Sequence, residues 1–137
     1  LAAFIPIIIG MGGNVGTQSS TIIVRGIATG RIEIGNGFKV LLKELGVGLI
    51  LGVLYGIMLG IFANFKFLGS DPMLGVVVGL SICSSMLLAT AVGTFTPLIL
   101  RKLDIDPAVA TGPFVTTSID ILGVLLYFMI AGLLLTL

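Results

Sequence analysis

A single segment near the end of the chain determines how it is built: Asp106-Pro-Ala-Val-Ala-Thr-Gly-Pro-Phe-Val-Thr-Thr-Ser-Ile-Asp120-Ile-Leu-Gly123. Asp106 is a favourable N-cap residue, and Pro107 stands at the first helical position, where a missing N–H costs nothing. A helix from there to the end of the chain is about 45 Å long, enough to cross a bilayer with tilt. Asp120 then lies near the middle of the membrane, where a carboxylate costs roughly 2.5–3.5 kcal/mol on insertion scales.

The composition around this segment predicts a membrane domain. The chain has 137 residues, of which 57% are hydrophobic and only 9% charged, whereas a soluble domain carries about 25% charged residues. Four apolar segments each exceed the roughly 20 residues that a spanning helix needs. We therefore expect an all-α, polytopic membrane protein whose four transmembrane helices cover residues 1–24, 40–65, 72–100 and 107–137. The chain begins inside an apolar segment, as a fragment of a longer protein would.

The charge distribution predicts the topology. Six of the seven basic residues lie in or beside the first and third connections, and only Lys66 lies in the second. By the positive-inside rule, residues 25–39 and 101–106 are cytoplasmic, and both ends of the chain face the outside of the plasma membrane. A net charge of +1 gives no reason to expect a nucleic-acid partner. The six basic residues are Arg25, Arg31, Lys39, Lys43, Arg101 and Lys102.

The first segment contains a polar, glycine-rich block between Gly10 and Thr21. Several of its residues recur at helical spacing and share one face with Arg25. One interpretation is a face of small and polar residues that packs against another helix, which is common in membranes. The other is a face along a water-filled cavity, or a locally unwound helix that presents carbonyl groups there. The face consists of Gly10, Asn14, Thr17, Gln18 and Thr21, with Gly13 in the same block.

The second and third segments favour structural interpretations. Gly48, Gly52, Gly56 and Gly60 form a four-residue repeat, the small-xxx-small pattern that lets two membrane helices approach closely. Lys43 and Glu44 are expected to be solvated at the start of this helix. The hydroxyl groups of the third segment, including Ser81, Ser85, Thr90 and Thr94, are expected to bond to carbonyls of their own or a neighbouring helix. Asp71-Pro72 repeats the capping pattern of Asp106-Pro107.

The last segment carries a stripe of polar residues that leads to Asp120. Gly112, Thr116 and Asp120 are four residues apart, and Thr117 lies beside them. Pro113 frees the carbonyl of Val109 from the helical ladder. Intramembrane carboxylates face a bundle interior or a water-filled cavity, and they usually mark an ion or proton pathway.

The partner of Asp120 must be a cation from outside the apolar segments, because no Lys or Arg lies in the middle of any of them. With no histidine and a single cysteine, the chain can bind a metal ion only through oxygen atoms, which favours Mg²⁺, Ca²⁺ or Mn²⁺. A two-fold axis along this helix would place two Asp120 carboxylates around one pore, and hydrated Mg²⁺ is typically held by one or two carboxylates. An enzyme is not expected, because no nucleophile–base pair is present.

Two of these motifs together resemble the MgtE family of magnesium channels and its eukaryotic solute-carrier relatives. The first motif is Gly12-Gly-Asn-Val-Gly-Thr-Gln-Ser19 with Val24-Arg-Gly26, and the second is Asp106-Pro-Ala with Gly112-Pro-Phe-Val-Thr-Thr-Ser-Ile-Asp120. The resemblance implies a homodimer in the lipid bilayer, with five transmembrane helices per subunit and a Mg²⁺ pore along the dimer axis. The first and last segments here correspond to the family's second and fifth helices, which line that pore. The family's first helix and its cytosolic regulatory domains are absent from this chain.

Carried over by position, the resemblance implies that Asp120 holds hydrated Mg²⁺ and that Asn14 faces the same ion. The expected function is passive Mg²⁺ conduction with no organic cofactor. The main alternative is a proton- or sodium-coupled secondary transporter of divalent cations that uses Asp120 as its coupling site. A non-transporting membrane scaffold is the other alternative. The residues expected to line the pore are Gly10, Gly13, Thr17, Gln18, Thr21, Gly112, Thr116 and Thr117.

Overall fold

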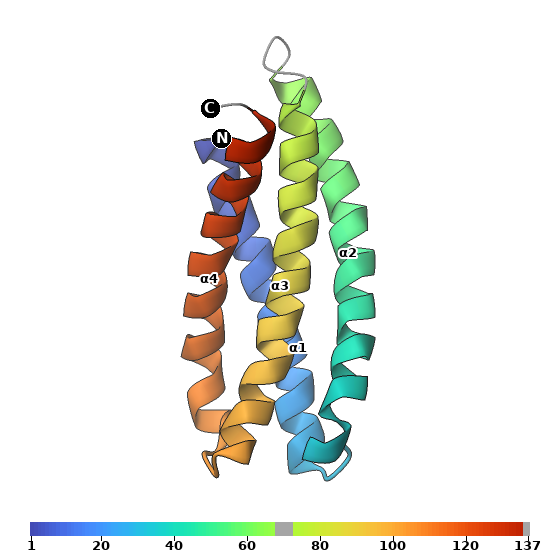
Figure 1. The fold of residues 1–137 in the computed structure, drawn as a ribbon, viewed down its shortest axis with the longest axis vertical. Helices are drawn as coiled ribbons and strands as arrows, with labels where there is room; N and C mark the ends of the chain where they lie inside the picture. The colour runs from blue at the N-terminus through green and yellow to red at the C-terminus, as the bar shows by residue number, and fades with distance from the viewer. Residues whose placement is uncertain (68–72, 136–137) are drawn as a thin grey trace.

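The computed structural model describes residues 1–67 and 73–135, and this part of the chain forms a bundle of long helices with no strand (Figure 1). The all-helical prediction is therefore confirmed. Two short 3-10 helices precede α1 and α2. The elements in order are η1 (Ala2–Phe4), α1 (Ile5–Ala28), η2 (Ile34–Asn36), α2 (Gly37–Lys66), α3 (Leu74–Lys102) and α4 (Pro107–Leu134).

Each of the four long helices coincides with one predicted apolar segment. The largest difference is at α1, which continues four residues beyond the predicted end at residue 24 and stops at Ala28. The start of α4 follows the predicted cap, because the Asp106 carboxylate accepts a hydrogen bond of 2.9 Å from the amide of Ala108. The predicted cap at Asp71-Pro72 and the predicted end at residue 137 lie outside the described residues.

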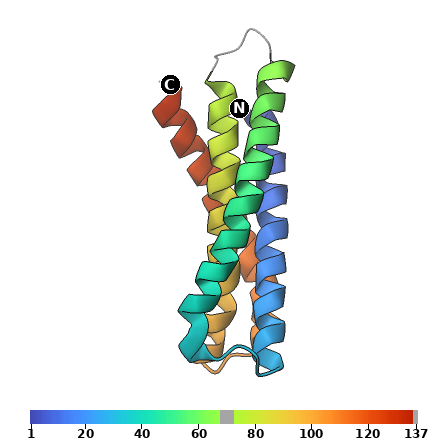
Figure 2. The same ribbon diagram turned by 90° about the vertical axis from the view of Figure 1, so that its right-hand side faces the viewer.

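Helix α3 is the centre of the bundle. It packs against α1, α2 and α4, and α1 also packs against α4, whereas α2 packs mainly against α3 (Figures 1 and 2). The start of α1 and the end of α4 lie at one end of the bundle, beside the end of α2. The connections from α1 to α2 and from α3 to α4 both lie at the other end, so the basic residues of these two connections are on the same side.

Among the described residues, three helical stretches are long and apolar enough to cross a membrane, namely Gly37–Lys66, Leu74–Lys102 and Thr111–Leu134. This pattern fits a multi-pass membrane protein. Helix α1 is not among the three, because its glycine-rich polar block lowers its hydropathy, so its crossing of the membrane stays a prediction. Half of the apolar stretch of α3 is buried, against 22% in α2, which identifies α3 as the core helix and α2 as a peripheral one.

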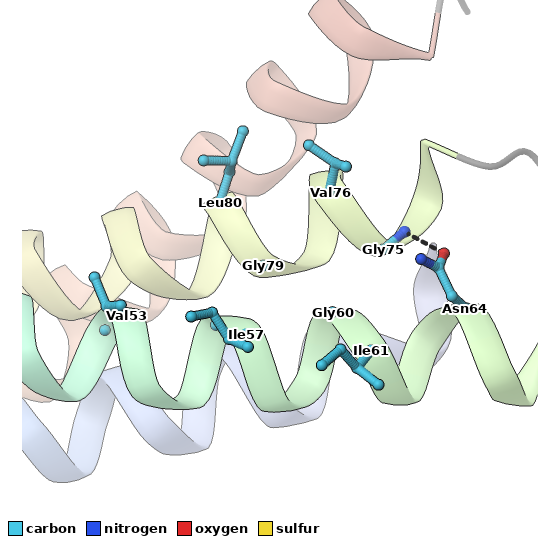
Figure 3. Close-up of a pocket in the computed structure, with 11 residues that line it drawn as sticks. Val53, Ile57, Gly60, Ile61, Asn64, Gly75, Val76, Gly79 and Leu80 are labelled. Atoms are coloured by element: carbon cyan, nitrogen blue, oxygen red, sulfur yellow. Dashed lines mark hydrogen bonds between the residues drawn. The ribbon is translucent and has the colours of Figure 1, made fainter.

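The contact between α2 and α3 is built from glycines. Gly48, Gly52, Gly56 and Gly60 are all buried and lie along the side of α2 that meets α3. A Cβ atom on Gly60 would lie 2.7 Å from the carbonyl oxygen of Gly75, closer than any real contact, so only glycine permits this approach. At the end of the contact, the Asn64 side chain accepts a 3.0 Å hydrogen bond from the amide of Gly75 (Figure 3). This bond satisfies one of the otherwise unpaired amides in the first turn of α3.

Candidate functional site

The polar block of α1 lies within one uninterrupted helix. The structure has no break between Ile5 and Ala28, so the interpretation as a locally unwound helix is wrong. The reason is that the hydroxyl groups bond to the helix itself. Thr17 donates to the carbonyl of Gly13 and Thr21 donates to the carbonyl of Thr17, both at 2.7 Å. These bonds satisfy the hydroxyl protons without opening the backbone and leave oxygen lone pairs on the outer side of the helix.

Helix α1 has two distinct faces. The buried face packs against α3 and α4 and includes Ile8, Gly12, Gly16, Ser19, Ser20 and Ile23. The polar residues occupy the opposite face, where Gly10, Asn14, Thr17, Gln18 and Thr21 are exposed, and Gly13 is half-buried at its edge. Packing within the chain therefore uses the glycines Gly12 and Gly16. The predicted polar face stays free for water, ions or another subunit.

Two surface pockets bring the predicted residues together. Asn14, Thr17, Gln18 and Thr21 line one of about 430 Å³ along α1. A second, of about 310 Å³, joins α1 to α4 at the end of the bundle where the basic connections lie. It is lined by Thr17, Ser20, Thr21, Val24 and Arg25 from α1 and by Pro107, Ala108, Thr111 and Gly112 from α4.

Asp120 lies on the same side of α4 as the second pocket. It belongs to a row spaced by four residues that begins with Ala108 and Gly112, which line that pocket, and continues through Thr116. Thr116 and Asp120 are half-buried, whereas Gly112 and Thr117 are exposed. The Thr116 hydroxyl donates to the carbonyls of Gly112 and Pro113, each at 3.2 Å.

The packing of Ile119 places Asp120 and Asn14 at the same depth. Ile119 is fully buried, and its side chain fills the space in front of both Gly12 and Gly16. Asn14 is midway between these glycines in sequence, and Asp120 directly follows Ile119. The amide of Asn14 and the carboxylate of Asp120 are therefore at one level of the bundle, on neighbouring helices.

The Asp120 carboxylate has no counter-ion in the described part of the chain. Among residues 1–67 and 73–135 it forms neither an ion pair nor a hydrogen bond, and no three His, Cys, Asp or Glu residues there are grouped closely enough to hold a metal ion. One chain thus offers a single carboxylate with the amide and hydroxyl oxygens of α1 nearby. These are hard oxygen donors, which suit a hydrated divalent cation.

The structure also contains polar contacts that differ from the expectations. Glu44 is not a fully solvated residue, because it is half-buried and accepts a 3.0 Å hydrogen bond from the hydroxyl of Ser19 on α1. Of the α3 hydroxyls, Thr90 bonds to the carbonyl of Met86 as expected. The expected bonds are missing at three buried hydroxyls, which have no partner within the described residues: Ser81, Ser85 and Thr94.

Comparisons with known proteins agree with the resemblance in the motifs. A family model named MgtE, described as a divalent cation transporter, matches residues 5–130. The chain is similar to the magnesium transporter MgtE of Thermus thermophilus, with 39% identity over 98% of this chain and 29% of that protein. It is 35% identical to the Bacillus subtilis magnesium transporter MgtE, over 96% of this chain. It spans about 29% of the length of these relatives. The chain therefore belongs to the MgtE family of divalent cation transporters.

Proposed function

We propose that two copies of this chain form a passive Mg²⁺ pore between their α1 and α4 helices. The observation that carries the proposal is the shared depth of Asp120 and Asn14, next to an exposed polar face of α1 and without a counter-ion for the carboxylate. A second copy related by a two-fold axis would bring a second carboxylate to this level. The family membership, together with relatives that are magnesium transporters, supports Mg²⁺ as the ion.

The chemistry of Mg²⁺ fits this arrangement. Mg²⁺ gives up its water reluctantly and is usually bound by one or two carboxylates while it keeps several waters. In the proposed pore, the two Asp120 carboxylates attract the hydrated ion, and the Asn14 amides with the Thr17 and Thr21 hydroxyls accept hydrogen bonds from its waters. A membrane potential of 100 mV lowers the free energy of an entering divalent ion by about 4.6 kcal/mol, twice the value for a single charge.

The distribution of charge supports an orientation in the plasma membrane. Both strongly basic connections lie at the same end of the bundle, next to the pocket that joins α1 to α4. With these connections in the cytoplasm, an ion would enter from the outer end, meet Asp120 and leave past Arg25. The regulatory domains implied by the resemblance would act at this cytoplasmic end.

One observation also supports a coupled transporter. A carboxylate without a counter-ion in a membrane helix can be neutralised by a proton instead of a metal ion, and Asp120 has this environment. In this second candidate, Asp120 would alternate between a proton or Na⁺ and the divalent cation. The two candidates differ in what drives the uptake of Mg²⁺.

Liposomes that contain the purified protein separate the two candidates. We expect Mg²⁺ uptake to increase with an inside-negative K⁺ diffusion potential and to be unchanged by a pH gradient or a Na⁺ gradient. Protein-free liposomes at the same potential are the control. Uptake that follows the pH or Na⁺ gradient at zero potential would establish the coupled transporter and contradict the passive pore.

A further inference from the structure

We infer that the contact between Gly16 of α1 and Gly93 of α3 sets the width of the ion pathway. The inference rests on the proposed function, in which the polar face of α1 lines that pathway. It assigns a positioning role to α3, a helix that supplies none of the residues lining the two polar pockets.

The contact is a direct approach of two backbones. A Cβ atom on Gly93 would collide with the carbonyl oxygen of Gly16, and it would lie 3.0 and 3.1 Å from the carbonyl carbon and Cα of Gly16. All three are backbone atoms, so no side chain can rotate to make room. One turn away, a Cβ on Gly12 would lie 2.9 Å from the Ser85 hydroxyl oxygen and 3.1 Å from Ile119. Because four residues of α1 lie directly between these two contacts, they hold one turn of the helix against α3.

The direction of the effect follows from the two faces of α1. Gly12 and Gly16 are on the buried face, and Asn14, Thr17 and Thr21 are on the opposite, exposed face. Any displacement of α1 away from α3 therefore moves the polar side chains outward, toward the second copy. In a two-fold dimer both copies move, so the pathway narrows from two sides. A filter for a hydrated ion responds strongly to such a change in its diameter.

The contact between α2 and α3 provides a matched control. A Cβ on Gly79 of α3 would lie 2.9 Å from the carbonyl oxygen of Gly56 on α2, which is again a backbone atom. Gly79→Ala therefore introduces the same methyl group into the same kind of contact on the same helix. It displaces α2, which supplies no residue to either polar pocket, instead of α1.

The decisive measurement is the unitary Mg²⁺ conductance of single dimers in planar bilayers. A folding defect lowers the number of active channels, whereas a narrower pathway lowers the current through each one. We expect Gly93→Ala to lower the unitary conductance several-fold and Gly79→Ala to leave it at the wild-type value. An unchanged conductance in Gly93→Ala, or an equal fall in both variants, would overturn the inference. Absence of Mg²⁺ current in the wild type would instead refute the proposed function.

A compensated pair tests the same idea when Gly93→Ala fails to assemble. Gly12→Ala is expected to lower the unitary conductance, because its methyl group meets the Ser85 hydroxyl. Ser85→Ala removes that oxygen and breaks no described hydrogen bond, since the Ser85 hydroxyl has no partner in the described chain. The double variant should regain most of the wild-type conductance, and Ser85→Ala alone should retain it. A double variant as low as Gly12→Ala would overturn the inference.

Discussion

Asp120 is the residue around which the chemistry of this domain is arranged. A carboxylate in a membrane helix is stable only with a partner, and the described chain supplies no cation at its level. The neighbouring oxygens belong to neutral groups, the amide of Asn14 and the hydroxyls of Thr17 and Thr21. Such groups orient water around an ion without competing for its charge. The site thus attracts a divalent cation but holds it through water, which favours release as well as entry.

The hydrogen bond between Ser19 and Glu44 is a second contribution from single residues. It links the buried face of α1 to α2, two helices that otherwise share little packing. Interhelical hydrogen bonds in membranes contribute about 0.6 kcal/mol on average and up to about 1.7 kcal/mol. We expect Glu44→Ala to lower the unfolding temperature in detergent by this amount of stability, and Glu44→Gln, which keeps an acceptor, to lower it less.

Glu33→Ala is the control for this prediction. Glu33 is an exposed carboxylate in the connection between α1 and α2, and its side chain makes no described hydrogen bond. Its removal should leave the unfolding temperature unchanged. Equal losses in Glu44→Gln and Glu44→Ala would show that the charge, and not the bond to Ser19, stabilises the bundle.

Between helices, glycine contacts determine which faces remain available for function. The buried glycines of α2 bring its backbone against α3, and Gly12 and Gly16 do the same for α1. Both helices consequently turn their larger side chains outward. On α2 these side chains are apolar and face lipid, whereas on α1 they are polar and face the proposed pore.

Gly60→Ala tests the contact between α2 and α3. Its methyl group would lie 2.7 Å from the carbonyl oxygen of Gly75, so the two helices must separate. Overpacking of this kind typically costs about 1–3 kcal/mol. We expect a lower unfolding temperature in detergent for Gly60→Ala and none for Gly46→Ala, because Gly46 is on the same helix with no atom within 4 Å of its Cβ position. Equal stability of the two variants would contradict the role of the glycine contact.

The helices were predictable from the sequence because each depends on local features. The apolar runs, and the cap at Asp106, determine most of their bounds, and the periodicity of Asn14, Thr17 and Thr21 identifies a polar face. The partners of each face were not predictable, because they depend on which helices become neighbours. Ser19 and Glu44 are 25 residues apart, and no local pattern connects them. The depth shared by Asn14 and Asp120 likewise emerges only from the packing of Ile119.

For the molecule as a whole, the bundle has one strongly basic end. Its orientation can be measured by labelling single cysteines in a Cys83→Ser background with a membrane-impermeant maleimide. We expect Lys66→Cys, exposed at the end of α2, to be labelled in intact cells. Gly35→Cys, exposed in the connection between α1 and α2, should be labelled only after permeabilisation. The reverse pattern would contradict the proposed orientation.

The most direct test of the proposed pore is Mg²⁺ uptake by liposomes that contain Asp120→Asn, compared with Asp104→Asn. Both variants replace one carboxylate by an amide of the same size. Asp104 is an exposed residue in the connection between α3 and α4, with a positive φ of 57° that asparagine also adopts readily. We predict that Asp120→Asn abolishes potential-driven Mg²⁺ uptake while the dimer remains intact, and that Asp104→Asn retains it. Wild-type uptake by a folded Asp120→Asn dimer would contradict the assignment of Asp120 to the ion pathway.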